Sequence, residues 1–179
     1  MKKITTIICL FLFSCTLIAQ ANQQNIAEYP VQIVADRFEV DISGNIINAQ
    51  GNIKIQQGSL CILSDKANYT DKKEKISLTN RVKLTYKELK INCAVMIYDR
   101  QYSEIKAKKN LEVFFKDLRA VSKSLIYKVK KEKIYFKGKT TIFRKKNIIR
   151  GKDIIIDLKK NKVYSNRQTK FILEDLDSN

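Results

Sequence analysis

The sequence predicts an all-β, elongated protein built from five similar units, and two observations lead to this prediction. The first is a repeat of 29 residues, seen most directly in the spacing of Tyr69, Tyr98 and Tyr127. The second is the alternation of apolar and polar side chains within each unit, as in residues 76–79 (Ile-Ser-Leu-Thr). Strand pairs that contact only their neighbours stack into a long body with two exposed ends.

The repeat continues in both directions and predicts the turns and one strand of each unit. A step of 29 residues reaches Val40 going backward and Ile156 going forward. A polar stretch follows each of the five anchors, which predicts turns at 41–46, 70–75, 99–104, 128–133 and 157–162. A strand follows each turn and begins at Ile47, Ile76, Ile105, Ile134 and Val163. Over the five units, the four inward positions of these strands are apolar except at Thr140, Ser165 and Thr169.

Two further sets of equivalent positions predict where the strands bend. Within the strand that follows each turn, the candidates for a bend or bulge are Gly51, Asn80, Lys109, Gly138 and Arg167. A second strand precedes each turn and is expected at 33–40, 62–69, 91–98, 120–127 and 149–156. Small residues share one position of this second strand and predict close packing there: Ala35, Ser64, Cys93, Ser122 and Gly151.

The N-terminus has the layout of a secretory signal. Lys2 and Lys3 precede an apolar run from 4 to 18, and Ala19-Gln20-Ala21 follows it. We therefore expect a signal peptide at 1–21, a flexible tail at 22–29, the β domain at 30–173 and an acidic tail at 174–179. The alternatives are acylation at Cys15, or retention of the run as an anchor, although it is shorter than the ~20 residues of a spanning helix.

Charge and residue types limit the classes of function. The formal charge is +17, so an anionic partner is expected. A secretory signal places the chain where nucleic acid is scarce, so a phosphorylated glycolipid fits better than nucleic acid. A merely Lys-rich, solvated surface is the other interpretation. The chain has no histidine, so we expect no metal, no other cofactor and no enzyme. Cys61 and Cys93 form a disulfide if their strands are neighbours, or else are small apolar fillers.

Four segments together carry a resemblance to a known family: residues 30–36 (Pro-Val-Gln-Ile-Val-Ala-Asp), 51–58 (Gly-Asn-Ile-Lys-Ile-Gln-Gln-Gly), 64–67 (Ser-Asp-Lys-Ala) and 150–154 (Arg-Gly-Lys-Asp-Ile). They resemble the OstA-like N-terminal family, to which the periplasmic lipopolysaccharide-transport protein LptA belongs. The similarity covers essentially the whole mature chain. It implies a periplasmic, antiparallel β-jellyroll, open at both ends, with an apolar groove for the acyl chains of lipid A.

The resemblance also implies partners and sites. The partners are lipopolysaccharide, LptC-like and LptD-like proteins, and further copies of the chain arranged head to tail, but no nucleic acid. The expected self-association edges are Ile33, Val34, Ala35, Tyr164 and Phe171. The expected groove residues are Ile47, Ile53, Ile55, Ile76, Leu78, Val82, Leu84, Ile105, Leu111, Val113, Ile134, Phe136 and Ile142. Plain core packing is the other interpretation of each groove residue, and only the stripe as a set favours lipid.

Three other functions are weighed against a lipid carrier. The chain could be an LptC-like acceptor anchored in the inner membrane, or an envelope scaffold with a dry interior. An enzyme that acts on glycans would need paired carboxylates. The candidate acids fall at turns or strand edges of the repeat, which favours a structural role; they are Asp36, Asp65, Asp99, Asp153 and Asp157.

Overall fold

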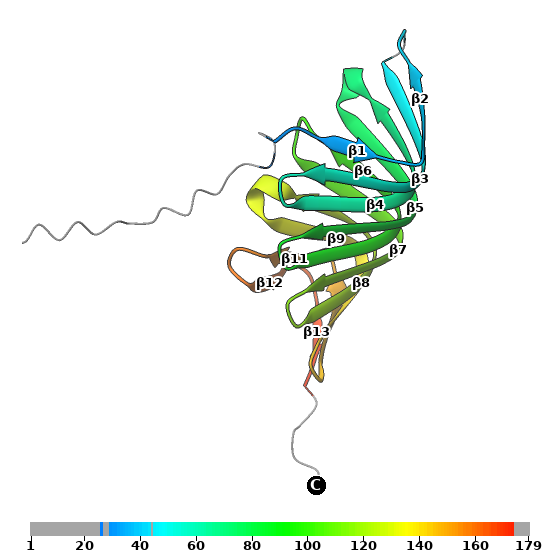
Figure 1. Ribbon diagram of the computed structural model, residues 1–179. Coiled ribbons are helices and arrows are strands. Elements are labelled where there is room, and N and C mark those ends of the chain that lie inside the picture. Colours follow the sequence, from blue (N-terminus) through cyan, green and yellow to red (C-terminus); the bar gives the residue numbers. More distant parts are fainter. Residues whose placement is uncertain (1–25, 27–28, 44, 174–179) are drawn as a thin grey trace, which may run out of the picture.

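The structure is a computed structural model that describes residues 26, 29–43 and 45–173, and within these residues it is all-β (Figure 1). The strands are β1 (Gln32–Val34), β2 (Arg37–Asp41), β3 (Ile46–Gln57), β4 (Leu60–Thr70), β5 (Lys75–Tyr86), β6 (Leu89–Asp99), β7 (Glu104–Phe115), β8 (Leu118–Lys128), β9 (Lys133–Arg144), β10 (Asn147–Lys152), β11 (Ile154–Asp157), β12 (Lys162–Ser165) and β13 (Lys170–Ile172). The described residues include no helix that is long and apolar enough to span a membrane.

All the strands belong to one antiparallel sheet. From β3 to β10, strands that are consecutive in sequence are also neighbours in the sheet, and β1 and β13 lie at the two ends of the order. The strands are stacked along the long axis and curve over on themselves, so the sheet forms an open jellyroll around an apolar interior (Figure 1). The predicted all-β, antiparallel architecture is confirmed.

The predicted turns between the strands are present. Two of them contain short 3-10 turns, η2 (Asp71–Lys73) and η3 (Val129–Lys131). Each of the five turns has a residue of left-handed φ at the same place in the repeat: Asn45, Glu74, Ser103, Glu132 and Asn161. The 29-residue period therefore extends to the backbone conformation of the turns.

The predicted bends are β-bulges in four of the five units. Gly51, Asn80, Lys109 and Gly138 have φ values of 78°, 65°, 64° and 80°, and the strand register shifts at each of them. A bulge inserts an extra residue and increases the local bend, which folds each long strand over the interior. Arg167 is the exception, because its φ is not left-handed and the fifth unit is split between β12 and β13.

The small residues lie opposite these bulges. Ser64 pairs with Ile53, Cys93 with Val82, and Ser122 with Leu111. At Gly151, an added Cβ would come within 2.7 Å of Thr169 Oγ1. Close packing at the bend therefore explains why small side chains occupy this position.

Two strands that were predicted to be continuous are each divided in two. The strand expected at 33–40 is divided into β1 and β2, with Ala35 and Asp36 between them. Within the described part of the chain both pieces pair only with β3, so a second strand does not hold them in one line. The strand expected at 149–156 is divided into β10 and β11 at Asp153, where a φ of 53° interrupts the extended backbone.

Ile26, which lies within the flexible tail expected at 22–29, is buried. Ile26 is only 6% exposed and belongs to the apolar core, and the backbone N–H of Tyr29 donates to its carbonyl. Burial of this apolar side chain stabilises the position of Ile26 against the core. The expected signal peptide at 1–21 and the acidic tail at 174–179 lie outside the described residues.

Candidate functional site

The predicted groove residues form one continuous apolar surface inside the jellyroll. They come from β3, β5, β7 and β9, and all of them except Ile47 are at most 2% exposed. Ile47 is half-buried near the N-terminal end. The structure thus brings the whole predicted stripe together, while contact of these residues with lipid stays a prediction.

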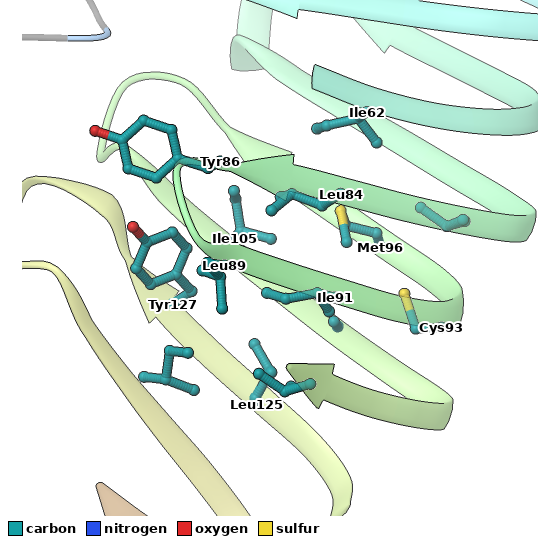
Figure 2. Close-up of a cluster of buried hydrophobic side chains, with 14 of the residues drawn as sticks. Ile62, Leu84, Tyr86, Leu89, Ile91, Cys93, Met96, Ile105, Leu125 and Tyr127 are labelled. Carbon is teal, nitrogen blue, oxygen red and sulfur yellow. The ribbon is translucent and has the colours of Figure 1, made fainter. Parts of the chain in front are cut away.

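The rest of the apolar interior comes from β4, β6, β8 and β11, which lie beside the predicted strands in the sheet, and the sequence prediction did not include it. These residues are Leu60, Ile62, Leu89, Ile91, Met96, Tyr98, Leu118, Leu125, Tyr127, Ile154 and Ile156, and Figure 2 shows several of them. The bulges interrupt simple alternation in these strands, so the period of two is weak there. The 29-residue spacing of Leu60, Leu89 and Leu118, or of Met96, Leu125 and Ile154, is the signal that would have found them.

The interior opens at its N-terminal end into a cavity of about 310 Å³. Its lining is almost wholly apolar and consists of Val31, Ile33, Phe38, Val40, Ile47, Tyr69 and Ile76. Phe38 and Val40 are also 46% and 57% exposed. The Tyr69 hydroxyl is held at the rim by donating to Asp71 Oδ1 at 2.8 Å. This end therefore presents apolar surface that is continuous with the buried stripe through Ile47 and Ile76.

The short hairpins, such as the one after Gln57, meet the longer turns, such as the one after Tyr98, along one side of the jellyroll, and we call this line of contact the seam. Near the N-terminal end the seam is a chain of hydrogen bonds centred on Gln57, which is 1% exposed. The Tyr98 hydroxyl donates to Gln57 Oε1 at 2.7 Å, and Gln57 Nε2 donates to the carbonyl of Tyr29 at 2.9 Å. Burial raises the pKa of Tyr98 to about 12. The seam is therefore closed here by fully partnered polar groups.

One repeat further along, the same seam has different contacts. Tyr86 and Tyr127 take the positions of Gln57 and Tyr98, and Figure 2 shows their hydroxyl groups on the same side of the core. The Tyr127 hydroxyl is buried and has no hydrogen-bond partner among the described residues, and burial raises the pKa of Tyr127. An ion pair between Lys87 Nζ and Glu132 Oε1, at 2.6 Å, crosses the seam beside them.

The predicted self-association residues lie at opposite ends of the sheet. Ile33 and Val34 are in β1, which pairs with β3 alone, and Val34 is 62% exposed. Phe171 is in β13, which pairs with β10 alone, and it is 55% exposed. Tyr164 is in β12 and 38% exposed, whereas Ala35 lies in the break after β1. Within the described residues, each end of the jellyroll therefore has an edge strand and exposed apolar side chains.

The structure does not meet the condition for a disulfide between Cys61 and Cys93. Both thiols are free, and β5 lies between their strands, β4 and β6. Strands two places apart are separated by roughly 9.5 Å, which exceeds the Cα separation that a disulfide spans. Cys93 is buried, and burial raises its pKa to about 11. It therefore acts as a small filler opposite a bulge.

The acids that an enzyme would need are not paired with one another. Each has a basic or amide partner of its own: Asp36 with Asn52, Asp65 with Arg81, Asp99 with Lys75, Asp153 with Arg167, and Asp157 with Lys133. Among the described residues, no three acids or cysteines gather as a metal site would require. This arrangement fits a structural role at the turns and bends.

Comparisons with known proteins were made by sequence family and by structure. No curated protein matches this sequence. A solved structure, LptH of Pseudomonas aeruginosa, described as the LptA homologous periplasmic component of the lipopolysaccharide transport device, is 14% identical with a TM-score of 0.35; the alignment covers 84% of this chain and 99% of LptH. The model of the family "LptA/(LptD N-terminal domain) LPS transport protein" matches residues 32–162. Because that match runs from the first residue of β1 to the first residue of β12, the chain belongs to this family of lipopolysaccharide-transport proteins.

Proposed function

We propose that the chain is a periplasmic carrier that holds lipopolysaccharide by its acyl chains inside the jellyroll and passes it toward the outer membrane. The observation that carries this proposal is the uninterrupted apolar interior that opens into an apolar cavity at the N-terminal end. The family is one of transport components and not of enzymes.

The physical reason for such an interior is the cost of exposing hydrocarbon to water. Each acyl methylene exposed costs about 0.8 kcal/mol, so a lipid with several chains needs a long apolar surface and no chemical step. Because the central residues are at most 2% exposed, lipid reaches them only when the two sides of the seam separate. The terminal cavity, which is already open, is the place where entry begins.

The two ends of the jellyroll support assembly with related proteins. Addition of a strand from a second molecule to β1 or β13 supplies partners for the edge and covers exposed side chains such as Val34 and Phe171. We therefore propose head-to-tail association of the chain with itself, and with LptC-like and LptD-like proteins at the inner and outer membranes.

Photo-crosslinking in cells tests the lipid path. A photoreactive residue is placed at Ile47 in the cavity and at Leu111 in the central interior, and a matched probe is placed at Lys83, which is exposed on β5. We expect lipopolysaccharide adducts at Ile47 and Leu111 and none at Lys83. Circular dichroism of each purified variant checks that the probe leaves the β-fold intact.

A dry scaffold is the second candidate function, and the close packing of the central interior favours it. Absence of adducts at both inward positions, with all variants folded, would reject the carrier in favour of the scaffold. Adducts at Ile47 alone would restrict binding to the terminal cavity. The mass of the protein, measured in the periplasmic and the membrane fractions, decides separately between cleavage after Ala21 and an LptC-like retained anchor.

A further inference from the structure

The internal repeat allows equivalent positions at the bend of the sheet to be compared. The residue that follows the small residue of each second strand is Asp36, Asp65, Ala94, Lys123 and Lys152 in the five units. In the second, third and fourth units this residue lies opposite the bulge of an adjacent strand, whereas Lys152 pairs directly with Lys139, next to Gly138. The position therefore changes from acidic at the N-terminal end to basic at the C-terminal end.

In the first two units the acid at this position has a partner from the bulge. Asn52 Nδ2 donates to Asp36 Oδ2 at 2.9 Å. Arg81 donates to both oxygens of Asp65, at 2.8 to 3.2 Å. Arg81 holds the pKa of Asp65 below its ordinary value, chiefly through this hydrogen bonding. The bend is therefore stabilised by a polar contact in the N-terminal half.

The fourth unit replaces this ion pair with two cations. Lys123 and Lys139 lie 58 residues after Asp65 and Arg81, and so occupy their places. Lys139 is also the direct register partner of Lys152 across β9 and β10. Like charges directly opposite each other destabilise an antiparallel pair. No ion pair of these three lysines is present among the described residues.

Further lysines extend the same surface. Lys108 and Lys137 are both register partners of Ser124, one from each side, and so continue the row across β7, β8 and β9. The acid at this bend, Asp153, forms an ion pair with Arg167 at 3.1 Å and accepts a hydrogen bond from the backbone N–H of Gly138 at 3.3 Å. We call the exposed set the lysine ridge: Lys108, Lys109, Lys123, Lys137, Lys139 and Lys152.

We infer that the lysine ridge docks the protein on an anionic phospholipid bilayer. The ridge spans four strands, or roughly 15 Å, on the outer face of the bend, and it has the form of a broad surface and not of a pocket. Lysine ammonium groups are point charges without the planar fork that selects one phosphate or carboxylate. Such a cluster is attracted by the negative potential of a headgroup layer, which also relieves the repulsion between Lys123, Lys139 and Lys152.

This docking surface is separate from the apolar interior. The groove residues point to the inside of the jellyroll, whereas the ridge lies on its outer face. The inference therefore does not depend on lipid in the interior, and it holds or fails independently of the carrier proposal.

Co-sedimentation of the purified chain with vesicles tests the inference. One set of vesicles contains phosphatidylglycerol and phosphatidylcholine in equal parts, and the other contains phosphatidylcholine alone. We expect binding to the first set only, weakening as salt is raised. In a variant with Lys123→Asp and Lys137→Asp, binding should weaken by at least about 25-fold, since each lysine near such a surface contributes about fivefold.

The matched control carries Lys72→Asp and Lys83→Asp, which change the net charge equally at exposed positions away from the ridge. It should weaken binding by less than about threefold, because distant charges are screened. Thermal melting verifies that both variants fold. If the two variants lose vesicle binding equally, net charge alone explains binding, and the proposal of a local docking surface is wrong. Binding to soluble polyphosphate without binding to the vesicles, or equal binding to neutral vesicles, would overturn the bilayer assignment.

Discussion

The N-terminal half of the jellyroll, β1 to β6, and the C-terminal half, β7 to β13, share one repeat but differ in how it is completed. The N-terminal half has an open cavity, a fully hydrogen-bonded seam at Gln57 and an ion pair at the bend between Asp65 and Arg81. In the other half the interior is packed, the Tyr127 hydroxyl has no partner, and the bend brings Lys123 and Lys139 together.

The difference teaches that the repeat and the polar contacts serve separate purposes. Alternation and bulges are retained through the first four units and maintain the fold. The side chains at the seam and at the bend vary from unit to unit, whereas a bulge residue with left-handed φ recurs in each of these four units. They are therefore free to set where the jellyroll is open and which surface is charged.

The largest expected effect compares the same substitution in the two interiors. Phe136→Ala, at a side chain that is 1% exposed, should lower the free energy of unfolding by about 3 to 5 kcal/mol. Phe38→Ala, in the open cavity at 46% exposed, should lower it by less than about 1 kcal/mol. Urea unfolding measures both, and similar losses would show that the N-terminal end is packed as tightly as the centre.

The next effect compares equivalent tyrosines at the seam. Tyr98→Phe leaves Gln57 Oε1 buried without its donor, so the free energy of unfolding should fall by about 1 to 3 kcal/mol. Tyr127→Phe removes a hydroxyl that has no partner, so stability should be unchanged or slightly higher. A large loss in Tyr127→Phe, measured in the same urea experiment, would reveal a contact of that hydroxyl in solution.

The seam should also make stability depend on pH in the alkaline range. The pKa of Tyr98 is raised from 10.0 to about 12 by burial, so the folded state holds its proton more tightly than the unfolded state. This contribution is complete below pH 10 and is lost as the pH rises toward 12. Between pH 10 and pH 12 the free energy of unfolding should therefore fall by about 2 kcal/mol less in Tyr98→Phe than in the wild type. Parallel pH profiles of the two proteins would contradict the assignment to Tyr98.

The smallest expected effect concerns the bend. Lys123→Asp gives Lys139 the acidic partner that Arg81 has in Asp65, so the melting temperature should rise slightly at low salt. Asp65→Lys places a second cation beside Arg81 in the second unit and should lower the melting temperature. Both differences should shrink in high salt, because exposed charges are screened. Shifts that are independent of salt would mean that packing, and not charge, distinguishes the two bends.

Several elements were predictable because they depend on local rules. The turns, the bulges at Gly51, Asn80, Lys109 and Gly138, and the inward stripe follow from alternation and from the 29-residue period. The inward residues of the second strands were missed because the register shifts at the bulges break their alternation. The role of Ile26 could not be foreseen either, since it lies outside the repeat and is buried only by the open end of the sheet.

The sequence by itself determined the number of units, the strand periodicity, the turns and the strongly positive charge, because each is encoded within about 30 neighbouring residues. Only the tertiary structure decided which residues meet across the seam, where Gln57 and Tyr98 are 41 positions apart, and that β5 separates Cys61 from Cys93. It also decided the closure of the interior and the alignment of lysines from four strands. The physical reason is that these contacts depend on how far each strand bends over its neighbours, and that bend is set by the packing of the whole sheet.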